Sequence, residues 1–361
     1  MNRTESSPVF LDRNLSVYLD LARFIAAMAV LLDHMKQFGL YPEDGFFSGY
    51  AHSAVIYFFV LSGLVIANST AKGYDGKSYI SARAARIYSV AIPALLLSFI
   101  SKGIFSYGSG QFPDYLSQDV TWVNFLGPIL FLNESWGLGA KVPWNGPYWS
   151  LCYEVWYYIL FGCFVYYKGV ARIYVLGLIC LIAGPAILLL MPIWLLGVRL
   201  SSLRNSCSLK RPVLVVIFFG SFFAGYFVIN SGVDHCIKDY LHNNVPGFWR
   251  LGNSQRFVTD YILALCVAAN IFSARFLMGG NCFFSDRMVR YVSAIAAMTF
   301  SLYIYHFPLL NILKRMNIHV GQNEFSAIPV VIFVLMACFV FSLFTEKKYL
   351  LLKQWIESKL A

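Results

Sequence analysis

The chain has 361 residues, of which 58% are hydrophobic and only 13% are charged, and its mean hydropathy is +0.62. This composition excludes a soluble globular protein and is typical of a helical protein that crosses a membrane several times. A net charge of +10 would favour nucleic acid as a partner of a soluble protein. Here basic residues that retain loops in the cytoplasm explain it, and we expect no nucleic-acid partner.

Apolar runs are spread along the whole chain, which predicts an all-α polytopic membrane protein with one membrane domain, residues 1–361. The polar start, Met1 to Leu15, lacks the apolar core of a signal peptide, so the first helix is expected to direct insertion. We expect about ten spanning segments, at Val17–Phe38, Ala51–Ser69, Ile87–Tyr107, Pro147–Tyr167, Ile173–Leu190, Pro192–Leu203, Val213–Asn230, Val258–Leu277, Val289–Ile312 and Ala327–Thr345.

Two places in this pattern are irregular. Only Met191 and Pro192 lie at the junction of the fifth and sixth segments, which predicts either a tight hairpin or one kinked segment. The run Val120–Leu132 is too short and too interrupted to span the membrane, so it predicts a re-entrant or interfacial helix in the second outer loop.

The distribution of Lys and Arg predicts the orientation. Most of these residues fall on one side of the membrane when the N-terminus is placed inside, so both termini are expected to be cytoplasmic. We expect the membrane to be the cell (inner) membrane. The long loops Gly108–Gly146 and Ser231–Arg256 then lie outside. No internal repeat is evident, which disfavours a transporter built from inverted repeats.

The first apolar segment carries two ionisable residues, Arg23 and His34. Their spacing of eleven residues places them on one stripe of a helix, about 16 Å apart along its axis. Such groups are costly in lipid, so both are expected to face protein or a water-filled cavity. Asp20 can pair with Arg23 on the same face, and Asp33 lies beside His34. Either a buried ion pair that holds helices together or a reaction site explains the stripe, and His34 suits a general base.

Three further motifs combine polar groups with apolar runs. Arg83 and Arg86 project two guanidinium groups in one direction, which suits phosphate but also suits simple retention of a cytoplasmic loop. Glu154 lies about one turn inside the fourth segment, where it could fix a cation or a sugar hydroxyl. His306 precedes Pro308, which frees backbone carbonyls in the ninth segment.

Other patterns indicate structure more than chemistry. The Ser62-Gly63 step permits close approach of helices, and we favour packing there over a hydrolytic triad of Ser62, His34 and Asp33, because no nucleophile-elbow pattern is present. The eight cysteines fall mostly in apolar runs without metal-ligand spacing, so neither a disulfide framework nor a metal site is expected.

Taken in order, these motifs resemble acyltransferase family 3, integral membrane proteins that modify bacterial surface polysaccharides. The similarity runs from about Ser16 to Glu346. The matching motifs are Leu19-Asp20-x-x-Arg23, Arg23-x10-His34, Phe58-Phe59-Val60-Leu61-Ser62-Gly63, Arg83-x-x-Arg86, Trp149-Ser150-Leu151-x-x-Glu154-x-x-Tyr157 and Ser301-Leu302-Tyr303-x-Tyr305-His306-x-Pro308.

The resemblance implies transfer of an acyl group, most often acetyl, from cytosolic acyl-CoA to a hydroxyl of a surface glycan or its lipid-linked precursor at the outer face. It implies that His34 is catalytic with Arg23 and Asp20 as its helix partners, and that Arg83 and Arg86 contact the CoA phosphates. We expect acyl-CoA as a co-substrate, no tightly bound cofactor, membrane lipids around the helices, and an acceptor site that includes Trp149, Glu154, Tyr157 and His306.

Two points depart from the family. Some relatives carry a fused extracytoplasmic domain, whereas this chain ends at Ala361, so transfer to the acceptor is expected within the membrane domain or its two outer loops. Glu346 precedes Lys347 where many relatives have a proline-containing step, so no role is expected for it. The alternatives are a proton- or anion-coupled transporter or flippase that uses the intramembrane Arg, Asp and His, or a structural membrane protein.

Overall fold

The computed structural model describes residues 11–71, 73, 75–108, 122–138, 142–203, 207–279, 283–321 and 323–360. Within these ranges the chain forms helices and no strand. The α-helices are α1 Arg13–Gln37, α2 Ala51–Thr70, α3 Gly76–Gly108, α5 Trp122–Ile129, α6 Tyr148–Tyr166, α7 Gly169–Ala183, α8 Pro185–Ser201, α9 Arg211–Asn230, α10 Val233–Asn244, α11 Phe257–Met278, α12 Asp286–Ala296, α13 Thr299–Arg315, α14 Ile328–Phe344 and α15 Tyr349–Leu360. Short 3₁₀ helices are η1 Ser135–Gly137, η2 Phe248–Ser254, η3 Glu324–Ala327 and η4 Glu346–Lys348.

The prediction of an all-α polytopic membrane protein is confirmed. Among the described residues, 6 helices are long and apolar enough to cross a membrane, or up to 8 if two bent pairs each count as one span. The expected total of ten is not confirmed. Helix α6 lies where the fourth span was expected, but its many Trp and Tyr residues make it less apolar than the helices counted.

The break between the fifth and sixth segments was predicted at the wrong place. Helices α7 and α8 meet at Gly184, and the chain bends there by 118°. Gly184 has φ +83, a conformation that favours glycine, and Pro185 begins the next helix because its fixed φ suits a first helical position. Pro192 instead lies inside α8.

Other predicted boundaries also shift. Helix α3 begins at Gly76 rather than at Ile87, so the Arg83-x-x-Arg86 motif lies on the helix and not before it. The ninth expected segment is a pair, α12 and α13, bent by 41°. The predicted loop Ser231–Arg256 contains α10 and η2, and helix α5 lies within Val120–Leu132. Residues 109–121 of the loop Gly108–Gly146 are outside the described ranges.

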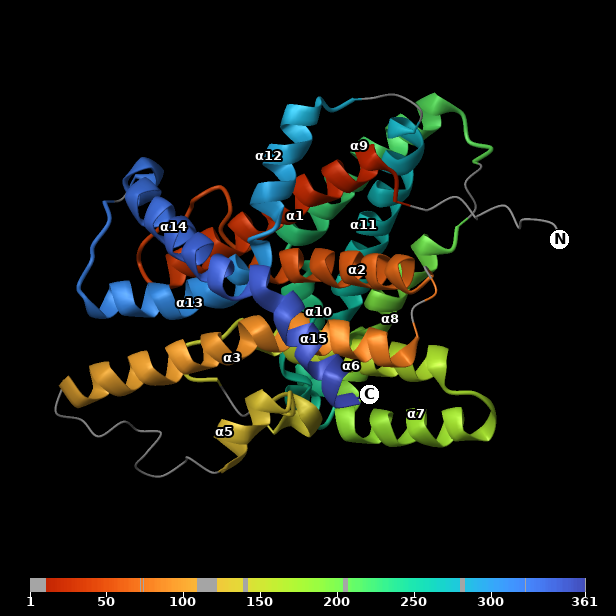
Figure 1. The fold of residues 1–361 in the computed structure, drawn as a ribbon. Helices are drawn as coiled ribbons and strands as arrows, with labels where there is room; N and C mark the ends of the chain where they lie inside the picture. Colours follow the sequence, from red (N-terminus) through yellow and green to blue (C-terminus); the bar gives the residue numbers. More distant parts are fainter. Residues whose placement is uncertain are drawn as a thin grey trace.

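Helix α2 lies at the centre of the fold, where it packs against α1, α6, α8 and α11 (Figure 1). Its crossing with α8 depends on two glycines. A Cβ added to Gly63 would lie 2.0 Å from the carbonyl oxygen of Trp194, and one added to Gly197 would lie 1.9 Å from that of Val60. The two backbones are therefore in direct contact, which confirms the predicted packing role of the glycine in the Ser62-Gly63 step.

Helix α13 packs against α1, α3 and α14, and the C-terminal α15 returns to lie along α3 (Figure 1). Ser81 on α3 donates a hydrogen bond to Glu357 on α15 at 3.0 Å. These contacts bring α1, α2, α3, α6 and α13 around one region, and the family motifs of the sequence analysis lie on these helices.

Candidate active site

Two adjoining cavities occupy the region enclosed by α1, α2, α3, α6 and α13. The first, here called the arginine cavity, has a volume of about 210 Å³ and is lined by Arg23, Arg83 and Arg86. The second, the histidine cavity, has a volume of about 380 Å³. Its polar lining consists of Asp33, His34, Gln37, His52, Trp149, Lys238, Asn253, Gln255, Arg256 and Tyr303.

Helix α1 contributes ionisable residues to both cavities. Arg23 lines the arginine cavity, and its guanidinium group lies 3.4 Å from the Asp20 carboxylate. His34, three turns further along, lines the histidine cavity. The prediction that both side chains face protein or a cavity is therefore confirmed, and so is the pairing of Asp20 with Arg23. The stripe does not bring Arg23 and His34 together in one cavity.

A chain of hydrogen bonds determines which nitrogen of His34 is free. His306 Nδ1 lies 2.9 Å from the carbonyl oxygen of Leu302, and His306 Nε2 lies 2.8 Å from His34 Nδ1. Because a carbonyl oxygen only accepts, His306 carries its proton on Nδ1, and its Nε2 accepts from the Nδ1–H of His34. Neutral His34 then has its lone pair on Nε2. This nitrogen can accept a proton or act as a nucleophile.

Packing fixes the His34 ring in the same arrangement. The rings of His34 and His306 lie 5.1 Å apart at 16°, and the Phe307 ring meets His34 edge-on at 5.1 Å. The carboxylate of Asp33, the residue immediately before His34, accepts hydrogen bonds from the backbone N–H groups of Gly49 at 2.6 Å and Ala51 at 3.1 Å. Asp33 therefore ties the end of α1 to the start of α2, where it satisfies backbone donors that a helix leaves unpaired.

A second histidine lines the same cavity and was not predicted. His52 Nε2 lies 2.9 and 3.1 Å from the two carboxylate oxygens of Asp260, so Nε2 carries the proton and donates to the carboxylate. The His52 ring also stacks on Trp149, with centroids 5.9 Å apart. One feature of the sequence could have indicated this pair: His52 and Asp260 are ionisable residues near the starts of two apolar segments.

The arginine cavity brings the two motif arginines together with Arg23. Arg83 Nε is buried and has no hydrogen-bond partner among the described side chains and backbone. Arg86 lies 3.9 Å from the Glu346 carboxylate, which also accepts from Ser301 Oγ at 3.0 Å and Ser301 N at 3.3 Å. Glu346, for which no role was expected, thus holds Arg86 at the wall of the cavity.

Glu154 lies in the arginine cavity and not in the histidine cavity. Its Oε1 accepts a hydrogen bond from Ser62 Oγ at 2.5 Å and another from the Tyr158 hydroxyl. Trp194 Nε1 donates to Ser62 at 3.1 Å. Both hydroxyl donors therefore meet one oxygen of Glu154, and the network holds this side chain in the wall of the cavity that Arg83 also lines.

The remaining expected site residues are separated by the structure. Trp149 and His306 lie at or beside the histidine cavity, whereas Tyr157 lines neither cavity and donates to the carbonyl oxygen of Ile187 at 2.9 Å. Ser62 and His34 line different cavities. A hydrolytic triad of Ser62, His34 and Asp33 is therefore excluded by the geometry.

Comparison with known proteins identifies the family. The family model described as an acyltransferase domain, acyltransferase family 3, matches residues 16–347. The chain belongs to this family. An O-acetyl transferase of Shigella phage Sf6 is 23% identical over 251 residues, which is 62% of this chain and 73% of the relative. No solved structure matches the chain.

This membership decides between the functions that the sequence left open. The protein is an O-acyltransferase of the multi-pass membrane class. The two cavities of this acyltransferase, one lined by arginines and one by histidines, lie within the matched residues.

Proposed function

We propose that this acyltransferase moves an acetyl group from cytosolic acetyl-CoA to a hydroxyl of a surface glycan or its lipid-linked precursor at the outer face of the membrane. The observation that carries the proposal is the pair of adjoining cavities, with cationic side chains on one side and a histidine with a free Nε2 on the other. Donor and acceptor would then enter from opposite sides and meet at His34.

The arginine cavity suits the donor. CoA carries phosphate groups that stay out of hydrocarbon, and arginine binds phosphate through paired N–H donors. The unpartnered Nε of Arg83 offers such a donor, and the side chains of Phe58, Leu61 and Val65 give the same cavity an apolar wall for the slender pantetheine arm. With the N-terminus inside, as the Lys and Arg distribution favours, this cavity is on the cytosolic side.

The histidine cavity suits an acceptor that is rich in hydroxyl groups. Its lining includes the carboxamides of Gln37, Asn253 and Gln255, which both donate and accept hydrogen bonds, and the indole of Trp149. Lys238 adds a cation at the same wall. A saccharide of a lipid-linked precursor, with membrane lipids around the helices, fits this combination.

The chemistry requires one proton relay. An acceptor hydroxyl gives its proton to His34 Nε2 while its oxygen attacks the thioester carbonyl carbon. The carbon–sulfur bond then breaks, and the departing thiolate takes the proton from His34, which leaves free CoA and an O-acyl ester. An acyl-histidine route would use the same nitrogen as the nucleophile. In both routes His306 holds the His34 ring in the required tautomer.

Radiolabelled acetyl-CoA added to inside-out membrane vesicles tests the proposal. Wild-type protein should release free CoA and transfer label to membrane-associated material, and His34→Ala should reduce transfer by about 10²–10⁴-fold at equal protein level. His319→Ala is the matched control, because His319 is exposed and lines neither cavity. Transfer by His34→Ala within a few-fold of wild type would remove His34 from the chemistry.

A further inference from the structure

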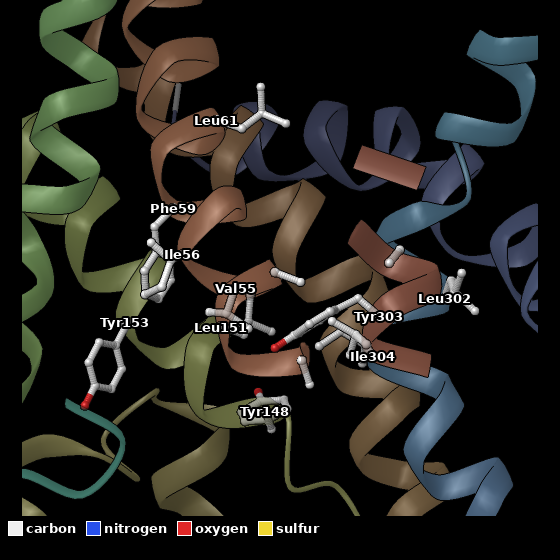
Figure 2. Packing of buried hydrophobic residues seen from close by; sticks show 14 of the residues in the cluster. Val55, Ile56, Phe59, Leu61, Tyr148, Leu151, Tyr153, Leu302, Tyr303 and Ile304 are labelled. Carbon is white, nitrogen blue, oxygen red and sulfur yellow. The ribbon is translucent and has the colours of Figure 1, made fainter. Parts of the chain in front are cut away.

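Two residues form the wall between the arginine cavity and the histidine cavity. Val55 on α2 and Tyr303 on α13 line both cavities, and no other described residue does so. Figure 2 shows the Tyr303 side chain extending from α13 towards Val55, with Leu151 of α6 beside them. Both side chains are buried, with 4% of Val55 and 8% of Tyr303 exposed.

Hydrogen bonds and a ring contact hold Tyr303 in this wall. The Tyr303 hydroxyl lies 2.6 Å from Ser150 Oγ and 3.2 Å from the carbonyl oxygen of Pro147, so α6 fixes its tip. The Phe58 ring meets the Tyr303 ring edge-on at 5.7 Å. Val55 is β-branched and has one strongly preferred rotamer in a helix.

This wall lies close to the two hydrogen-bonded histidines, His306 and His34. The Tyr303 ring lies 6.2 Å from the ring of His306, which in turn holds His34. A thioester that enters from the arginine cavity therefore brings its acyl group against Val55 and Tyr303 immediately before it reaches His34.

We propose that Val55 and Tyr303 determine the size of the acyl group that this acyltransferase accepts, and that they restrict it to short groups such as acetyl. The inference rests on the proposed function, because it requires the donor to come from the arginine cavity. Packed interiors resist added methylene groups, and one methylene in a close-fitting site changes discrimination by about 10- to 200-fold.

Competition between two donors tests the inference. Equal amounts of radiolabelled acetyl-CoA and butyryl-CoA are supplied to inside-out vesicles, and the ratio of the two esters formed is measured for each variant. Val55→Ala should shift the ratio towards butyryl by about tenfold or more. Val60→Ala is the matched control, because Val60 is a fully buried valine of the same helix that lines neither cavity, and its ratio should equal that of wild type.

The reverse change provides a second test that does not depend on Val55→Ala accumulating. Val55→Ile adds one methyl group to the wall that the acyl group must pass, so it should lower the rate of acetyl transfer while the KM for acetyl-CoA stays the same. Wild-type ester ratios in Val55→Ala, or a wild-type acetyl rate in Val55→Ile, would overturn the inference. A wild-type protein that transfers no acetyl from acetyl-CoA would instead overturn the proposed function.

Discussion

The role of His306 leads to a prediction that depends on a single hydrogen bond. His306→Leu removes the acceptor of the His34 Nδ1–H and leaves this donor buried without a partner, whereas the carboxamide oxygen of His306→Gln can replace it. An unpaired buried donor costs about 1–3 kcal/mol, which corresponds to about 5- to 150-fold in rate. If His34 changes its tautomer as well, the loss approaches the 10²–10⁴-fold that removal of a general base typically produces.

Acetyl transfer from radiolabelled acetyl-CoA in membrane vesicles, normalised to protein amount, measures the effect. We expect His306→Leu to lose at least about fivefold and His306→Gln to retain most of the activity, because only the Leu variant lacks an acceptor. The KM for acetyl-CoA should stay unchanged in both, since His306 does not line the arginine cavity. Equal activities of the Leu and Gln variants, or a Leu variant as active as wild type, would refute the tautomer argument.

Three further predictions concern the donor site, the helix crossing and a buried carboxyl group. Changing Arg83 and Arg86 together to Ala should raise the KM for acetyl-CoA more than that for the acceptor, and Lys at both positions should restore it partly, as a point charge without the paired donors; a change confined to the acceptor KM would contradict the assignment. Gly197→Ala should destabilise the fold by about 1–3 kcal/mol or more in thermal unfolding, whereas Gly177→Ala, which meets open space, should not. Burial raises the pKa of the Glu134 carboxyl from 4.5 to about 7. The stability linked to the neutral carboxyl is therefore fully present below pH 4.5 and is lost as the pH rises through about 7. Glu134→Gln should therefore melt above wild type at about pH 8 and match it near about pH 4, and a constant difference across this range would contradict the linkage.

Much of the site was predictable because single positions carry strong physical constraints. A charged or ionisable residue within an apolar helix must face protein or a cavity, and this alone placed Arg23 and His34 correctly. The spacing of Arg83 and Arg86 likewise predicted two guanidinium groups on one side, and both line the same cavity. Helical spacing could not show that Arg23 and His34 serve different cavities, because the wall between them comes from α2 and α13.

The errors have equally local causes. Proline was taken as the stronger break, but Pro192 is accommodated inside α8 and the chain turns at Gly184, where only glycine adopts the required φ without strain. His52 with Asp260, and Arg86 with Glu346, are pairs between residues that are far apart in the sequence. Their partners follow from the packing of α2 against α11 and of α3 against the C-terminal segment, which one sequence does not reveal.

The sidedness of the donor tests the central claim most directly. Acetyl-CoA does not cross membranes, so it is supplied separately to inside-out vesicles and to right-side-out spheroplasts from the same cells, and incorporated label is measured in each. The two-cavity account predicts transfer in the inside-out vesicles, with almost none in the spheroplasts and none above background for His34→Ala in either. Equal transfer in sealed spheroplasts would contradict it, because the arginine cavity would then not be the cytosolic entrance for the donor.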